Sequence, residues 1–268
     1  MLKASLPMYD LPPLRAANDR LWREIATHLR SLGVRQVPQS LTRDPKTARD
    51  WLADDLLFSQ TCGYPLTHAL KDKIRLVATP RYWLKEDARS DYCSYILVRE
   101  NDAAQSLEAL RGRRAVINSA DSQSGFSAFR HAVAPLAENG IFFSKVYISG
   151  AHLYSIQWLR EGAADVCAVD AITYELAAKW QPQALAGIRI IGDTAWAPCL
   201  PYITRLHCTD DEVRHLQTAL QAAIQSPALA TVCQALLLCG VEIRPISDYE
   251  RIDEIEDEAA ARGYPHLR

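Results

Sequence analysis

Short apolar runs alternate with helical segments along most of the chain. In residues 12–32, apolar side chains recur every three or four positions, and Pro12 and Pro13 stand at the start, so the pattern predicts an amphipathic helix. The remaining helices are predicted at 45–52, 65–70, 126–137, 153–161, 172–179, 210–224, 227–237 and 248–262. Strands are predicted at 3–8, 34–41, 56–58, 74–79, 93–99, 113–118, 145–149, 164–169, 188–191 and 202–204. This alternation predicts an α/β fold with mostly parallel sheets and helices on both faces.

Two places interrupt the alternation and indicate where the chain passes between two lobes. Residues 80–91 are charged and aromatic without a clean period, and residues 202–204 follow a proline-rich stretch. We therefore expect residues 1–88 to form the first part of lobe 1 and residues 89–198 to form lobe 2. Residues 199–268 are expected to return to lobe 1 and to end in helices. Two lobes joined by two hinge crossings predict a cleft between them.

Several predicted strands end in small polar residues immediately before a helix. The most conspicuous is Asn118–Gly125, NSADSQSG, which follows an apolar run. The first amides of a helix lack intrahelical partners and carry the positive end of its dipole, so such a turn attracts anions. Ligands of open α/β sheets bind at the carboxyl ends of strands. The polar residues at these positions are Tyr64, Ser122, Gln123, Ser124, His152 and Asp170.

Each of these residues has an ordinary structural alternative. Ser122, Gln123 and Ser124 have side-chain donors for an oxyanion, although a serine before a helix is commonly only its N-cap. His152 has a ring N–H to donate, or is structural.

Asp170 is either a helix cap or an acceptor for an acidic O–H or an ammonium group. Tyr64 and Tyr92 are placed to stack on an organic group or to donate to an oxyanion, with packing as the equal alternative. No sequence context marks Cys62 as an activated nucleophile, and we expect it to be a packing residue.

Composition and charge exclude several classes of function. The chain of 268 residues is 49% hydrophobic and has a formal net charge of -2, which disfavours nucleic acid as a partner. The seven cysteines form no C-x-x-C pair, so we expect free thiols in a reducing compartment and no metal site. No apolar run is long enough to insert into a membrane. The N-terminus does not read as a secretory signal, so the chain as given is expected to be cytoplasmic, or periplasmic if a leader had been removed.

The order of motifs resembles one known family. NSADSQSG, then SGAHLYSIQWLREGAADVCAVDAITYEL, then the Thr194–Pro201 stretch before PYIT are similar to the phosphonate/phosphate-type solute-binding proteins of ABC transporters. This resemblance implies a two-lobed periplasmic-binding-protein-like fold of type 2 that closes on a small oxyanion, a phosphonate, phosphite or phosphate ester. It also implies an ABC transporter permease as partner, and neither a cofactor nor a catalytic residue.

The resemblance also implies roles for individual residues. The phosphonate-holding helix start corresponds to Ser122, Gln123 and Ser124, and the later turns correspond to His152 and Asp170. The aromatic positions correspond most nearly to Tyr64 and Tyr92. Gln123 departs from the family pattern, in which a small hydroxyl residue is usual.

A second hypothesis is a cytosolic enzyme on the same scaffold, acting on a small carboxylated or phosphorylated metabolite. The cytosolic character of the chain favours it, as do the histidine, aspartate, tyrosine and cysteine that are expected near one cleft. The sequence contains no Walker loop and no G-x-G-x-x-G, H-E-x-x-H or G-x-S-x-G motif.

Overall fold

The chain divides into two compact units in a computed structural model that describes residues 2–44 and 49–268. Unit 1 comprises Met1–Ser90 and Pro198–Asp248, and unit 2 comprises Asp91–Ala197 and Tyr249–Arg268. The chain therefore passes between the units three times, not twice as the sequence predicted. The short strands β5 (Asp91–Tyr92) and β11 (Ala197–Pro198) lie at the first two crossings.

Unit 1 is built on a mixed sheet. Its strand order is β1 (Lys3–Ala4), β2 (Leu56–Gln60), β12 (Tyr202–Arg205), β3 (Ile74–Leu84) and β13 (Leu238–Glu242), with β4 (Asp87–Arg89) paired to β3. Its helices are η1 (Pro12–Leu14), α1 (Arg15–Ser31), α2 (Gly63–Thr67), α6 (Asp210–Gln225), η6 (Pro227–Leu229) and α7 (Ala230–Ala235), and η7 (Ile246–Tyr249) ends it. The strand β12 runs antiparallel to both β2 and β3, so this sheet is not mostly parallel, in contrast to the prediction.

The predicted stripe of α1 forms the core of unit 1. Leu21, Trp22, Ile25 and Leu29 are all buried, which confirms the helical period read from the sequence. The ring of Trp22 stacks on Phe58 of β2 with 5.9 Å between centroids. Helix α1 also packs against α6 and α7, so the three helices form one layer over the sheet.

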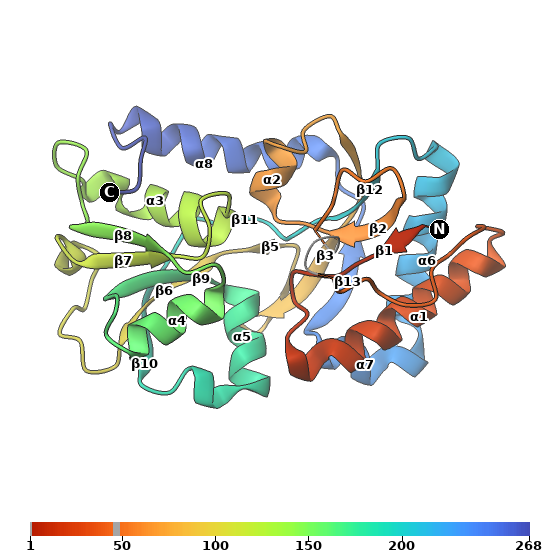
Figure 1. Ribbon diagram of the computed structural model, residues 1–268, viewed down its shortest axis with the longest axis horizontal. Coiled ribbons are helices and arrows are strands. Elements are labelled where there is room, and N and C mark those ends of the chain that lie inside the picture. The colour runs from red at the N-terminus through yellow and green to blue at the C-terminus, as the bar shows by residue number, and fades with distance from the viewer. Residues whose placement is uncertain (1, 45–48) are drawn as a thin grey trace. The chain divides into compact units, whose positions relative to one another are not determined.

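Unit 2 contains a second mixed sheet. Its strand order is β10 (Ile188–Asp193), β6 (Ser94–Arg99), β9 (Val166–Asp170), β7 (Arg114–Ile117) and β8 (Lys145–Ile148). Strands β9, β7 and β8 are parallel, while β6 and β10 are antiparallel to their neighbours. The helices are η2 (Glu108–Leu110), η3 (Gln123–Ser127), α3 (Ala128–Val133), η4 (Ala134–Leu136), α4 (His152–Arg160), α5 (Ala171–Trp180), η5 (Pro182–Ala184) and α8 (Glu250–Ala261). In Figure 1, α4 and α5 lie on one face of this sheet, and α3 and α8 lie together on the other.

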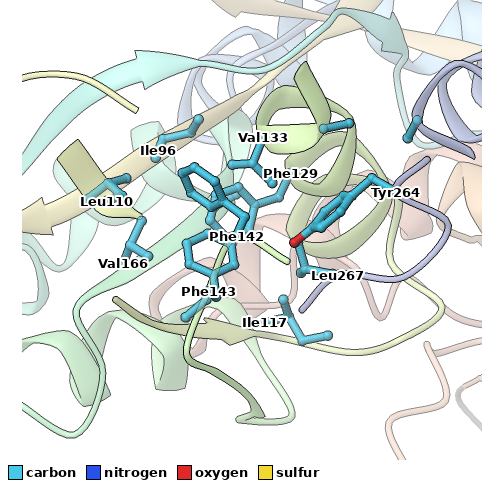
Figure 2. Packing of buried hydrophobic residues seen from close by; sticks show 14 of the residues in the cluster. Ile96, Leu110, Ile117, Phe129, Val133, Phe142, Phe143, Val166, Tyr264 and Leu267 are labelled. Carbon is cyan, nitrogen blue, oxygen red and sulfur yellow. The ribbon is translucent and has the colours of Figure 1, made fainter. Parts of the chain in front are cut away.

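The C-terminal segment belongs to unit 2, which corrects the prediction that residues 199–268 all return to lobe 1. Figure 2 shows Tyr264 and Leu267 packed among the rings of Phe129, Phe142 and Phe143. Two polar contacts join α8 to α3, an ion pair from Arg130 to Glu256 at 3.1 Å and a hydrogen bond between Nε2 of His131 and Glu258 at 2.7 Å. The apolar face of α8 thus covers the core of unit 2, and the sequence pattern alone did not identify which core it would cover.

Residues 34–41 form no strand, although the sequence predicted one. Pro38 has no amide to donate, and Gln36 has a φ of 59°, which interrupts an extended backbone. The carbonyl of Pro38 accepts hydrogen bonds from Trp22 Nε1 and Arg30 instead of from a strand. The helix predicted at 45–52 lies partly outside the described residues.

The predicted crossing at residues 80–91 is mostly a hairpin of unit 1. Strand β3 continues to Leu84, and Lys85 and Glu86 have φ values of 52° and 66° before β4 returns along β3. Two consecutive left-handed residues form the kind of tight turn that matches the twist of a hairpin. The crossing itself follows at Ser90.

A buried carboxylate stabilises the end of the unit 2 sheet opposite Asp170. Asp165 accepts two hydrogen bonds from the Arg114 guanidinium, at 2.9 and 2.8 Å, and one from Arg99 at 3.0 Å. The Arg114 hydrogen bonds hold the pKa of Asp165 well below its usual range.

We expect Asp165→Asn to lower the free energy of unfolding by about 2 kcal/mol, because both guanidinium groups lose their counter-charge. Urea unfolding of the purified variant measures this loss. Asp211→Asn is the matched control, since it removes the exposed partner of Arg214 and should cost less than about 0.5 kcal/mol. Equal losses in the two variants would contradict the role given to Asp165.

Candidate functional site

The turn that was predicted to attract an anion, Asn118–Gly125, lies at the start of a continuous helical segment in unit 2. We call this turn the anion cradle. Strand β7 leads to Ser122, and η3, α3 and η4 follow without interruption. The Ser122 hydroxyl accepts from the Gly125 amide at 3.0 Å, so the N-cap reading is confirmed. The segment opens with a wide turn of π-helix type, in which the Ser127 amide donates to the Ser122 carbonyl at 3.0 Å. Turns of this type are rare and frequently occur at functional sites.

A serine and a histidine from two of the predicted turns meet at this helix start. Oγ of Ser124 and Nε2 of His152 share a hydrogen bond of 2.9 Å, and Oγ of Ser122 lies 3.3 Å from Oγ of Ser124. Burial lowers the pKa of His152 from its usual 6.5 to about 4, and the nearby carbonyl of Ala168 offsets part of this effect. The imidazole is therefore neutral at physiological pH.

Gly125 is required by the close packing at this start. A Cβ at this position would overlap Oδ1 of Asn118 and would lie 3.0 Å from Cγ of Asn118 and 3.2 Å from Cε1 of His152. The Asn118 side chain and the imidazole thus both lie against the glycine backbone. Only a residue without a side chain allows the cradle, Asn118 and His152 to approach this closely.

Asp170 lies at the carboxyl end of β9, the strand next to β7 in the sheet. Its Oδ1 accepts from the amide of Thr173 at 2.8 Å, so Asp170 is the N-cap of α5. Strand β9 packs against η3, which places this cap in the same region as the Ser124–His152 pair. The structure therefore brings Ser122, Gln123, Ser124, His152 and Asp170 together in unit 2.

The two predicted tyrosines are in different units. Tyr92 belongs to unit 2, where it is buried two residues before Ser94. Tyr64 belongs to unit 1, in the short helix α2 after β2, and its ring stacks on His68 with 3.8 Å between centroids. A contact of either tyrosine with a ligand stays a prediction.

The roles of Ser94 and Gly125 at the cradle were not identified from the sequence. The Ser94 hydroxyl donates to the carbonyl of Ser124 at 3.0 Å, and the Ser94 amide donates to Oγ1 of Thr194 at 2.9 Å. Ser94 begins a strand instead of ending one, so the rule that selected the other residues does not apply to it. Gly125 lay inside the motif, but its close contacts appear only in the folded chain.

We also searched the described residues for metal ligands, disulfides and membrane-spanning helices. Residues 2–44 and 49–268 contain no group of three or more His, Cys, Asp or Glu side chains arranged to hold a metal ion. All seven cysteines are free thiols, and all but Cys239 are buried. Among the helices in this part of the chain, none has the length and apolarity needed to span a bilayer.

A hollow of about 840 Å³ in unit 2 runs along α4 and contains none of the predicted residues. It is lined by charged and polar side chains such as Arg99, Gln157 and Arg160. The Arg99 guanidinium already donates hydrogen bonds to Asp165 and to the carbonyls of Leu159 and Ala164. The cradle thus remains the candidate site.

Comparison with solved structures shows the fold. The binding-protein component of an ABC phosphonate transporter from Pseudomonas aeruginosa superimposes with a TM-score of 0.80 at 13% identity, covering 98% of this chain and 87% of that one. PhnD1 from Prochlorococcus marinus in complex with methylphosphonate gives a TM-score of 0.76 at 16% identity, with 97% and 98% covered. A Xanthomonas citri protein bound to ATP gives 0.71 at 14% identity, with 98% of both chains covered. These likenesses confirm the type 2 periplasmic-binding-protein-like fold predicted from the sequence.

Comparison of the sequence with models of protein families identifies the family to which the chain belongs. No curated protein sequence matches the chain. A family model described as the phosphonate periplasmic substrate-binding protein of ABC transporters matches residues 15–249, which is most of the chain. This match confirms the resemblance drawn from the motifs around Ser122, His152 and Asp170. The chain belongs to the family of periplasmic substrate-binding proteins of ABC phosphonate transporters.

Proposed function

We propose that the protein binds a small phosphorus oxyanion, a phosphonate, phosphite or phosphate ester, at the helix start formed by Ser122, Gln123 and Ser124. The observation that carries this proposal is the hydrogen bond between Ser124 and His152 at the opening of the helical segment. It joins two turns that are far apart in sequence. The membership of the chain in a solute-binding family supports the same assignment.

The chemistry of the cradle suits an oxyanion that still carries a hydrogen-bond donor. The helix dipole and the first amides attract negative charge, and the Ser124–His152 pair supplies a further hydrogen. Of the five unit 2 residues brought together at the helix start, Asp170 is the one with a carboxyl group. A carboxylate repels a fully ionised ligand and accepts from an O–H or an ammonium group. We therefore propose that Asp170 selects a ligand that is protonated or bears an amine.

The remaining predicted residues have roles that follow from their burial. Gln123 is almost fully buried, and we propose that its long amide forms part of the wall of the cradle. The Tyr64 ring stacks on the ring of His68, and a contact of Tyr64 with the ligand stays a prediction. Tyr92 is buried, so its hydroxyl is the group for which we propose a contact.

Titration calorimetry of the purified protein with phosphate, phosphite and methylphosphonate tests the proposal. We expect heat from at least one of them, and we expect Ser124→Ala to weaken that binding about tenfold because one hydrogen bond to a charged group is lost. Ser59→Ala is the matched control, since it removes a buried hydroxyl bonded to Ser5 in unit 1. The assignment would be refuted if all three anions gave no heat and no thermal shift.

The family implies a transporter permease as partner, and we propose that the protein delivers its ligand to one. The seven cysteines led us to expect a reducing compartment, whereas the family is described as periplasmic. Cell fractionation with an antibody to this chain distinguishes the two locations. Recovery with the periplasmic fraction would contradict the cytoplasmic expectation.

The enzyme hypothesis has one observation in its favour, the contact of a serine hydroxyl with a neutral histidine. A serine nucleophile also needs a carboxylate to orient the imidazole. Within the described residues, no carboxylate hydrogen bonds to Nδ1 of His152. The pair therefore lacks its orienting acid, and we propose binding without turnover. Recovery of a chemically unchanged ligand after incubation supports this, and release of a hydrolysis product would oppose it.

A further inference from the structure

A side chain from a neighbouring strand is bonded to the backbone of the wide turn at the start of the helical segment. The Ser94 hydroxyl, buried at the beginning of β6, donates to the carbonyl of Ser124 at 3.0 Å. In an ordinary α-helix, the Ser122 carbonyl would accept from Phe126. Here it accepts from Ser127, one residue later. Side chains that insert into the hydrogen-bond ladder are a known cause of such irregular turns.

Ser94 is itself held firmly from two sides. Its amide donates to Oγ1 of Thr194 at 2.9 Å, and its carbonyl accepts from the Thr194 amide at 3.0 Å. On the neighbouring strand β9 it pairs with Asp170. Ser94 thus lies between the strand end that carries Asp170 and the turn that carries Ser124, and its position is set by the sheet.

We propose that Ser94 is a positioning residue of the anion cradle, which keeps the first turn wide and so aims the Ser124 amide and hydroxyl. This inference rests on the proposed function, because it concerns how that site is shaped. Its physical basis is the competition for backbone hydrogen bonds in the turn. Without the Ser94 hydroxyl, the turn gains by tightening to the α-helical pattern, and tightening rotates Ser124 relative to His152.

The test compares Ser94→Ala and Ser94→Thr with the unaltered protein. A crystal structure of Ser94→Ala without added anion should show the Ser122 carbonyl accepting from Phe126. Calorimetry with methylphosphonate should show about a tenfold loss of affinity in Ser94→Ala, and recovery to within about threefold in Ser94→Thr, which keeps the hydroxyl. Tyr264→Phe is the control, because it removes a hydroxyl bonded to the carbonyl of Arg268 in the same unit and should leave affinity unchanged.

The outcomes separate this inference from the proposed function. A Ser94→Ala protein that retains the Ser127 to Ser122 bond overturns the positioning role, whether or not any anion binds. An affinity loss that Ser94→Thr does not restore also overturns it, as does an equal loss in Tyr264→Phe. If the unaltered protein binds none of the anions, the proposed function fails, and the crystal structure of Ser94→Ala still decides the role of Ser94.

Discussion

Gly125→Ala is expected to lower the affinity for methylphosphonate by about 100-fold while the protein still folds. The added methyl group overlaps Oδ1 of Asn118 and presses on Cε1 of His152 at 3.2 Å. Because both side chains lie against the Gly125 backbone, the clash displaces the Asn118 amide and the imidazole together. Overpacking of this kind costs about 1–3 kcal/mol, and the displacement also breaks the Ser124–His152 contact. Calorimetry measures the affinity, and circular dichroism reports whether the fold is retained.

A double variant shows whether the clash with Asn118 is the cause. Asn118→Ala removes the overlapping side chain, so Asn118→Ala combined with Gly125→Ala should bind more tightly than Gly125→Ala alone. The matched control is Gly112→Ala, because Gly112 has no neighbour within 4 Å of an added Cβ and lies at a turn of the same unit. Gly112 has a φ of 73°, so this control loses stability but should keep its affinity. An affinity that Gly125→Ala leaves intact would show that the close approach is not needed.

The elements of the fold were predictable wherever local pattern and packing agree. The stripe of α1 and the strands that end before Asn118 and Gly150 follow from periodicity alone. Residues 34–41 were predicted as a strand, yet the carbonyls of Val37 and Pro38 are bonded by side chains of α1. Strand β13 follows Leu237, which has a φ of 56°, and such a left-handed leucine cannot be read from sequence. Long-range contacts decided these cases.

The contrast between local pattern and long-range contacts also explains which residues of the site were predicted from the sequence. Ser122, His152 and Asp170 were identified because each ends a strand of a parallel pair, a position defined by order along the chain. Ser94 lies in an antiparallel strand and enters the site from the opposite direction. The sequence predicts mostly parallel sheets, and in such sheets no residue at the start of a strand would reach this edge. Ser94 was thus missed because the strand that contains it was assumed to run parallel to its neighbours.

The stability of the protein is expected to fall as the pH is lowered from about 6.5 to 4, partly because of His152. The pKa of its buried imidazole is about 4 in the folded protein, below the usual value of 6.5. Between these values the unfolded chain binds a proton that the folded chain does not, so acid favours unfolding. The shift corresponds to at most about 3 kcal/mol, which is lost on acidification and is fully present above pH 6.5.

Urea unfolding of the unaltered protein and of His152→Gln at several pH values isolates this contribution. Carboxylates such as Asp165 titrate equally in both proteins, so the difference between the two curves belongs to His152. We expect the unaltered protein to lose stability more steeply below pH 6.5, and parallel curves would contradict the buried neutral imidazole. An anion bound beside the imidazole favours its protonated form and raises its pKa. Saturating methylphosphonate should therefore reduce the acid loss in the unaltered protein and leave His152→Gln unaffected, which ties the proton to the proposed site.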